Sequence, residues 1–114
     1  MNLNKKEIKL LFKIGKIYYY NNIFKLIYYK SIKNKISIII PKNRIKKSVN
    51  RNKIKRRIFY SLNINKFFIK IYPSYFIIFI YISKKNLKFN ILNYNIINII
   101  YKITNEKIFD YRTR

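Results

Sequence analysis

The chain has no cysteine, no histidine and only three acidic residues. Without cysteine, disulfides, thiolate zinc sites and thiol nucleophiles are excluded. Without histidine, the most common general base is missing. The acidic residues, Glu7, Glu106 and Asp110, lie near the two ends of the chain, whereas a two-metal hydrolytic site needs several converging carboxylates. We therefore do not expect the protein itself to carry hydrolytic chemistry.

A long hydrophobic run is also missing. The most apolar region, residues 67 to 82, is interrupted by Lys70, Pro73 and Ser74, and its longest uninterrupted run is the eight residues from Tyr75 to Ile82. A membrane-spanning helix needs about 20 apolar residues, so this run is typical of a buried strand. The first residues do not form the apolar region of a signal peptide. We expect a cytoplasmic protein without a membrane partner.

Positive charge dominates what is present. The 114 residues include 27 Lys or Arg, which gives a net charge of +24, yet 50% of the residues are hydrophobic. That apolar content is enough for a core, so we expect one folded domain over residues 1–114. No acidic residue lies between Glu7 and Glu106. The counter-ions of these cations must therefore come from outside the chain, and a bound polyanion would relieve their mutual repulsion. The abundant Ile, Lys, Asn, Tyr and Phe are also typical of an AT-rich genome, so charge alone does not identify the partner.

Local patterns predict an α+β fold. Asn4 and Glu7 have the spacing of a capping box, which predicts a first helix that ends at Gly15 with a left-handed C-cap. A turn is expected at Asn21 and Asn22. Further patterns predict strands over 18–20, 24–30 and 36–40, a helix over 48–63, a strand over 75–82, a helix over 89–103 and a frayed tail from residue 104. The expected architecture is a two-layer sandwich in the order helix-strand-strand-strand-helix-strand-helix.

The segment from Lys46 to Arg57 has seven Lys or Arg among twelve residues. In a helix that begins near Ser48, one face carries Lys53, Arg56, Arg57 and Tyr60, and the opposite face carries Ile54, Ile58 and Leu62. Such a helix can pack on a core with one side and bind phosphates with the other. Arg51 and Lys55 project toward the apolar side, so we expect them at the rim of the core.

Aromatic residues in the predicted strands allow two interpretations. Tyr18 to Tyr20, Phe24 and Tyr28 could stack on the bases of a single-stranded nucleic acid. They could instead fill the core, which is the usual place of strand aromatics in a small domain. We favour the core.

The basic segment resembles the signature of the bacterial ribonuclease P protein subunit. That family has a small residue and valine followed by x-R-N-x-x-K-R, which Ser48 to Arg56 match position by position. Phe12 and Gly15 match the end of the family's first helix, and Phe24-Lys25-Leu26 match its aromatic-led strand. There are two departures: Phe59 replaces the arginine that usually follows K-R-x-x, with Arg57 as a candidate substitute, and Ile8 replaces an aromatic residue.

The resemblance implies a four-stranded sheet with three helices and a left-handed crossover, a fold type also found in a ribosomal protein domain. It implies that an RNA subunit performs catalysis, with Mg²⁺ bound mainly by that RNA. The protein would bind the catalytic RNA, with one protein per RNA and no DNA partner. It would also receive the 5′ leader of precursor tRNA in a cleft between the first helix and the sheet, and so assist removal of the leader.

The resemblance also assigns candidate residues. The RNA contacts that it implies are Arg51, Asn52, Lys55 and Arg56, and charge alone adds four flanking phosphate contacts, Lys46, Lys47, Lys53 and Arg57. The candidates for the leader cleft are Ile8, Phe12, Phe24, Lys25 and Ile27. A shift of one residue in strand register would move a strand residue to the opposite face of the sheet.

Three other functions stay open at this point. A small basic ribosomal protein would share the charge and the lack of catalytic groups, but not the R-N-x-x-K-R match with its flanking strands. A nuclease that acts alone is disfavoured by the missing histidines and scattered acids. Binding to an anionic membrane surface would predict lipid binding.

Overall fold

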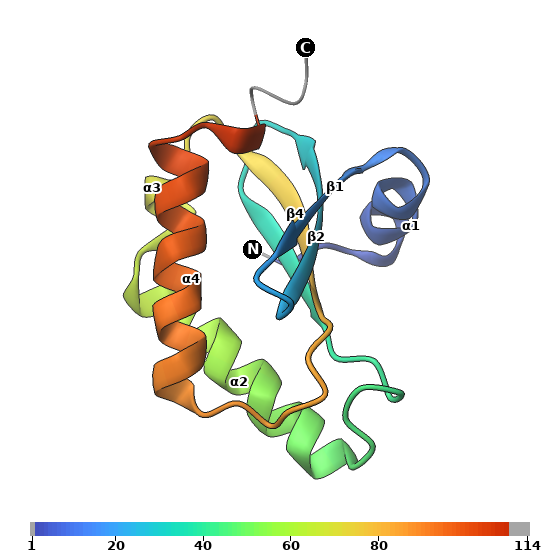
Figure 1. Cartoon of the computed structure of the whole chain (residues 1–114). Helices are drawn as coiled ribbons and strands as arrows, with labels where there is room; N and C mark the ends of the chain where they lie inside the picture. Colours follow the sequence, from blue (N-terminus) through green and yellow to red (C-terminus); the bar gives the residue numbers. More distant parts are fainter. Residues whose placement is uncertain (1, 110–114) are drawn as a thin grey trace.

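The computed structural model describes residues 2–109 (Figure 1). The element order confirms the predicted one, with a short additional helix, α3, before the last strand. The elements are α1 (Lys5–Ile14), β1 (Lys16–Tyr20), β2 (Phe24–Lys30), β3 (Lys35–Ile39), α2 (Ser48–Ile64), α3 (Phe67–Lys70), β4 (Tyr75–Tyr81) and α4 (Phe89–Thr104).

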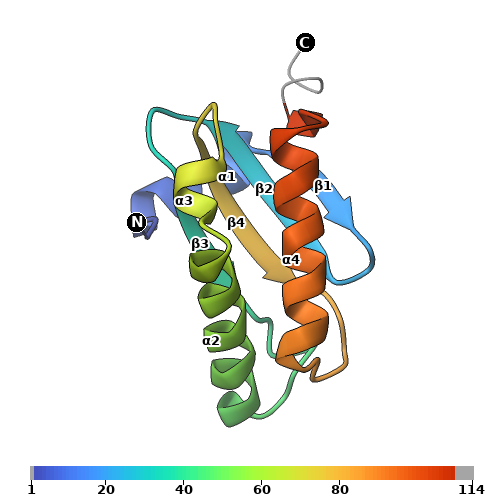
Figure 2. The ribbon, with the colours of Figure 1, turned by 90° about the vertical axis from the view of Figure 1, so that its left-hand side faces the viewer.

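The strands form a four-stranded sheet in the order β1-β2-β4-β3. Neighbouring strands are antiparallel except for β3 and β4, which are parallel. Helices α2 and α4 lie side by side over one face of this sheet, whereas α1 lies on the opposite face (Figures 1 and 2). The predicted α+β class with its four-stranded sheet is confirmed, and the position of α1 gives the two faces of the sheet different surroundings.

The connection from β3 through α2 to β4 has an uncommon hand. In Figure 2, which looks onto the α2 and α4 side, β3 and β4 run downward and β4 lies to the right of β3. The chain passes through α2 in front of the sheet before it returns to β4, so the crossover is left-handed. Because about 98% of such connections are right-handed, sequence pattern alone would have predicted the other hand.

The larger core lies between the sheet and helices α2 and α4. The predicted apolar stripe of α2 is confirmed, because Ile54, Ile58 and Leu62 are fully buried there. A smaller cluster on the other face contains Leu3, Leu11, Ile27 and Ile78. Most of the hydrophobic stabilisation therefore comes from the α2 and α4 side.

Alternation along β2 assigns its side chains to the two faces. Phe24, Leu26 and Tyr28 belong to the larger core, whereas Ile27 belongs to the smaller cluster beneath α1. The core interpretation is confirmed for Phe24 and Tyr28, which are at most 1% exposed. Strand β4 is apolar on both faces because the sheet is covered on both sides there. Within residues 2–109, no helix has the length and apolar character to span a membrane.

Asn34 fixes the connection between α2 and β4, whose shape the sequence did not predict. Its side-chain amide donates to the carbonyl oxygens of Phe68 (3.2 Å) and Ile71 (2.9 Å), and its Oδ1 accepts from the Tyr75 backbone N–H (2.9 Å). A buried asparagine with these partners satisfies backbone groups that neither α3 nor β4 can pair internally.

The prediction of a left-handed backbone at Gly15 is wrong. Gly15 has φ −68° and ψ 152°, which any residue can adopt. Instead, a Cβ atom at this position would lie 2.5 Å from Ile27 Cγ2 and 2.5 Å from the Leu11 carbonyl oxygen. Glycine is required by the close approach of the chain to β2. Positive φ values occur instead in the predicted turn, at Asn21 (51°) and Asn22 (56°), and also at Lys66 (57°) and Lys107 (50°).

The prediction of a frayed tail from residue 104 is wrong for residues 104–109, since α4 includes Thr104, while the rest of the tail lies outside the described residues. Phe109 is fully buried, and its ring stacks on Tyr28 with centroids 3.7 Å apart. The Tyr75 ring meets it edge-on at 5.0 Å. Phe109, together with the partly buried Ile108, therefore packs this segment against the larger core.

Candidate RNA-binding surface

Helices α2 and α4 begin at the same end of the molecule, at the bottom of Figure 2. Their N-cap residues are Lys47 and Lys88, and no side-chain cap is made at either position among the described residues. Neither first turn contains an acidic residue. The free N–H groups and the positive ends of two helix dipoles therefore add to the lysine charge, and this end of the molecule favours anions.

Arg51 closes the loop that leads into α2. Its Nη1 donates to the carbonyl oxygens of Ile45 (3.0 Å) and Lys46 (2.6 Å). This explains why Arg51 sits near the apolar side of the helix, because its partners belong to the chain just before α2. The family resemblance implied that Arg51 contacts RNA, and the structure adds a role in holding the loop that carries Lys46 and Lys47.

The remaining predicted RNA contacts form an exposed surface on α2. Asn52, Lys53, Lys55 and Arg56 are all exposed, as are the loop residues Lys46 and Lys47. In residues 2–109 the recorded ion pairs, Glu7 with Lys35 and Glu106 with Lys102, involve none of them. The structure thus brings the predicted residues together without internal counter-ions.

Arg57 is half-buried between α2 and the loop after β4. Its Nη1 donates to Asn86 Oδ1 (2.9 Å) and to the Leu87 carbonyl oxygen (3.0 Å). The Tyr81 hydroxyl fixes the same loop by donating to the Lys85 carbonyl oxygen, and burial raises the pKa of that hydroxyl. Arg57 therefore positions the loop, and it does not occupy the place of the arginine that Phe59 replaces.

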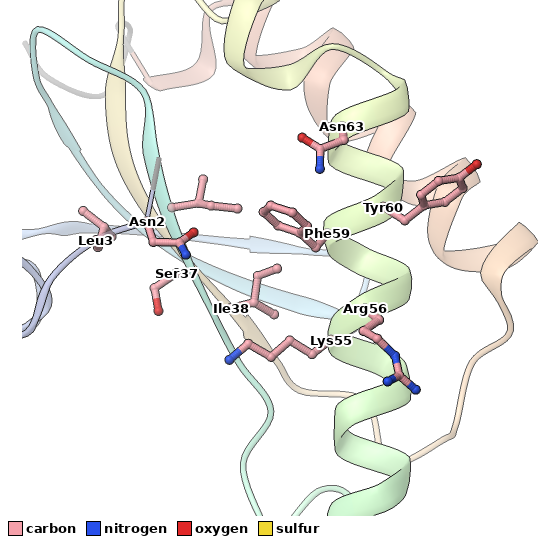
Figure 3. A pocket seen from close by; sticks show the side chains of 10 residues that line it. Asn2, Leu3, Ser37, Ile38, Lys55, Arg56, Phe59, Tyr60 and Asn63 are labelled. Atoms are coloured by element: carbon pink, nitrogen blue, oxygen red, sulfur yellow. The ribbon is translucent and has the colours of Figure 1, made fainter.

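A groove of about 680 Å³ separates α2 from the edge strand β3 (Figure 3). Phe59 points into it toward Ile38, and Lys55 lies at one end (Figure 3). Tyr60, the next residue, points to the other side of α2 (Figure 3). The replacement of arginine by Phe59 thus gives this groove an apolar wall, and it leaves Lys55 and Arg56 as the cations among its lining residues.

The predicted leader-cleft residues do not all lie together. The assignment of Phe24 is wrong, since it is fully buried in the core on the opposite face of the sheet. Ile27 faces α1 but is only 4% exposed. Ile8 and Lys25 are half-buried, and Phe12 is 56% exposed. Phe12, Ile8 and Lys25 therefore stay as candidates on the α1 side.

The core interpretation is wrong for Tyr19, which is exposed on this side of the sheet and was not among the predicted leader-cleft residues. It pairs with Lys25 in the β1–β2 register, and Lys25 pairs with Ile80 of β4. The Lys25 Nζ lies 5.8 Å from the centroid of the Tyr19 ring, which is 62% exposed. The alternation of side chains along β2 could have identified Tyr19. Lys25 points to the face of the sheet that α1 covers, Phe24 points to the opposite face, and Tyr19 pairs with Lys25.

No group of three or more His, Cys, Asp or Glu side chains comes together as a metal site within residues 2–109. Glu7 Oε2 is 3.1 Å from Lys35 Nζ, and Glu106 Oε1 is 3.5 Å from Lys102 Nζ. The described side chains therefore do not fit a protein-borne magnesium cage, which needs several oxygen ligands.

Comparisons with known proteins agree with this geometry. A family model described as Ribonuclease P matches residues 3–104. The fold is similar to that of the RNase P protein from Thermotoga maritima, with a TM-score of 0.74 and 22% identity over 90% of this chain and 97% of that one. The Staphylococcus aureus RNase P protein gives a TM-score of 0.72 and 22% identity, over 90% and 95% of the two chains. A search among curated protein sequences found no match.

Proposed function

Since the chain belongs to the ribonuclease P protein family, whose members are subunits of a tRNA-processing ribonucleoprotein and partner its RNA, we propose a specific division of work between its surfaces. The α2 surface binds the catalytic RNA. The α1 side of the sheet receives the 5′ leader of precursor tRNA. The RNA carries the chemistry, and one protein binds one RNA.

The α2 surface carries this proposal. One side of the helix is locked into the core by Ile54, Ile58 and Leu62. The other side exposes Lys53 and Arg56, which the described ion pairs leave uncompensated. Since a rigid row of cations neutralises phosphates and releases their counter-ions, this surface suits a folded RNA. Asn52 adds an uncharged amide that can both donate and accept hydrogen bonds.

The α1 side suits a single strand. Phe12 and Tyr19 expose aromatic rings there, and Lys25 supplies a charge beside Tyr19. Unpaired bases stack on aromatic rings, while cations hold the phosphates between them. A precursor leader is such a strand, whereas a duplex would hide the faces of its bases.

Magnesium enters this proposal through the RNA. The described carboxylates lie apart and pair with lysines. We therefore assign Mg²⁺ mainly to RNA phosphates, and the protein would assist by fixing the RNA and compensating its charge.

The proposal is tested by cleavage of a precursor tRNA with a 5′ leader at low magnesium. The arms are the cognate RNA alone, the RNA with the protein, and the protein alone. We expect the protein to lower the magnesium requirement of the RNA and to have no activity by itself. Cleavage by the protein alone would overturn the assignment of chemistry to the RNA. No effect of the protein on an active RNA would favour a ribosomal or other RNA-binding role, and titration to saturation gives the stoichiometry.

Leader binding is tested separately with Phe12→Ala. The ring is 56% exposed, so we expect a change in unfolding free energy below about 1 kcal/mol and weaker binding of substrates with long leaders. Leu10→Ala, on the same helix and 47% exposed, serves as the control that leaves leader binding unchanged. A loss of several kcal/mol, with leader binding intact, would place Phe12 in the core instead.

A further inference from the structure

The α2 surface also carries aromatic rings on the side of the helix that faces away from β3. A shallow hollow of about 260 Å³ is lined there by Lys53, Arg56, Arg57, Tyr60 and Phe89. The sequence pattern placed the first four on one face of the helix, and the structure adds Phe89 from the first turn of α4. The hollow therefore bridges the two helices.

The two rings of this hollow form a platform. The Tyr60 and Phe89 ring centroids are 5.5 Å apart, with an angle of 53° between the ring planes. Tyr60 is 59% exposed even though it touches Phe89. One side of the Tyr60 ring is supported by protein, and more than half of its surface is open to a ligand. A supported ring stacks on a base at a lower entropic cost than a freely rotating one.

The cations around the platform are of two kinds. Arg57 is held in place by Asn86 and Leu87. Lys53 and Arg56 are exposed, and the described ion pairs include neither of them. A fixed guanidinium and two open cations beside a ring match a nucleotide, which presents a phosphate next to the face of a base.

A duplex would not use the Tyr60 ring. Its phosphates could bind Lys53 and Arg56, but its bases are stacked inside the helix and leave an exposed ring without a partner. An unpaired nucleotide satisfies the ring and the cations together. The outer face of α4 lacks this combination of ring and cations. It exposes Tyr94, but the chain has no charged residue between Phe89 and Tyr101.

We propose that Tyr60, supported by Phe89, stacks on an unpaired base of the partner RNA while Lys53 and Arg56 bind the adjacent phosphates. This proposal rests on the proposed function, since it deepens the binding of RNA by α2. It assigns the surface to a bulged or single-stranded nucleotide and not to a base-paired stem.

The first test measures the affinity of Tyr60 variants for the cognate RNA. Tyr60→Leu keeps an apolar cover over Phe89 but removes the ring, and we expect at least about fivefold weaker binding. Tyr60→Phe should restore binding, because stacking needs the ring and not the hydroxyl. Tyr94→Leu is the matched control on α4, with no expected loss. Equal thermal unfolding midpoints for Tyr60→Leu and Tyr60→Phe would show that the weaker binding of Tyr60→Leu does not result from a loss of stability.

The second test uses fluorescence. The chain has no tryptophan, so Tyr60→Trp introduces a single reporter at the platform. We expect a single-stranded RNA oligonucleotide to quench it, while a blunt RNA duplex with the same number of phosphates has little effect. Phe59→Trp places the reporter on the β3 side of the same helix and should respond weakly to both RNAs.

The outcomes separate this inference from the proposed function. Equal quenching by duplex and single strand, or quenching at position 59 alone, would overturn the stacking site. If Arg56→Ala weakens binding to the cognate RNA and Tyr60→Leu does not, the stacking site is wrong while the RNA surface stands. If neither variant weakens binding, the assignment of α2 to RNA is itself wrong.

Discussion

At the amino end of α1, the Asn4 side chain accepts from the Glu7 N–H and the Glu7 carboxylate accepts from the Asn4 N–H, both at 2.8 Å. Lys35 Nζ completes this arrangement with an ion pair to Glu7 at 3.1 Å. At the amino end of α2, Lys47 caps nothing among the described residues, and the first turn has no acid. The first helix satisfies its own dipole, whereas the second leaves its positive end to a partner.

The two helices also differ in how they are anchored. Helix α1 fully buries only Leu11 and exposes Leu10, Phe12 and Ile14, whereas α2 buries a complete apolar stripe. The cations of α2 are therefore carried on a rigid support, while α1 exposes the Phe12 ring on the proposed leader-binding side. The comparison indicates that α2 provides charge in a fixed geometry and that α1 provides contact surface.

The largest expected effect tests the anchoring of α2. Ile58→Ala removes a fully buried side chain, and we expect it to lower the unfolding free energy by about 2–5 kcal/mol. Leu10→Ala on α1 should change it by less than about 0.5 kcal/mol, because the side chain is 47% exposed. Urea unfolding of both variants measures the difference. Equal losses would remove the distinction between the two helices.

The next effect concerns charge. Arg56→Ala should lower the slope of log affinity for the cognate RNA against log salt by about one unit, because one phosphate contact is lost. Lys6→Ala, an exposed cation at the amino end of α1, should leave the slope unchanged. Binding titrations over a series of salt concentrations provide the measurement. An unchanged slope for Arg56→Ala would argue against a phosphate contact at this position.

A smaller effect is expected at the caps. Asn4→Ala removes a side-chain acceptor from the capping box and should cost about 1 kcal/mol of unfolding free energy. Lys47→Ala, at the equivalent position of α2, should cost nothing, because no cap hydrogen bond is lost there. Denaturation of both variants makes the comparison. A cost at Lys47 would mean that the amino end of α2 is satisfied internally after all.

The smallest effect is a pH dependence at Glu7. The hydrogen bond from the Asn4 backbone N–H, aided by Lys35, holds the pKa of Glu7 below its ordinary value of 4.5. Because the folded pKa is lowered, the stabilisation is present above the unfolded pKa and is lost as the pH falls from 4.5 through the folded value. Glu7→Gln should remove this component from the stability–pH profile. Lys35→Gln should keep most of the pH dependence, because the hydrogen bond from the Asn4 backbone N–H is the largest single cause of the lowered pKa of Glu7.

Several features of α2 could be predicted from the sequence because they depend on local periodicity. A helix spaces Ile54, Ile58 and Leu62 along one side whatever it packs against, and the same spacing places Lys53, Arg56 and Tyr60 opposite. The capping box at Asn4 and Glu7 and the turn at Asn21 and Asn22 are also local. The structure confirms each of these.

The errors at Phe24, Gly15 and Phe109 share another cause. Each of these residues is defined by a neighbour distant in the sequence or in another element. The face of Phe24 depends on which side of the sheet α2 and α4 cover, and the need for Gly15 depends on the approach of Ile27. Phe109 is ordered by Tyr28 and Tyr75. No spacing within a short segment encodes such contacts.

The sequence by itself determined the polycationic character, the missing acid–base groups and the two sides of α2, because composition and helical spacing do not depend on tertiary contacts. Only the tertiary structure decided that Arg51 and Arg57 bind carbonyl groups while Arg56 stays open, and that Phe89 supports Tyr60. Arginine can bind a carbonyl or a phosphate equally well, so its partner is chosen by which acceptors the folded chain brings within reach.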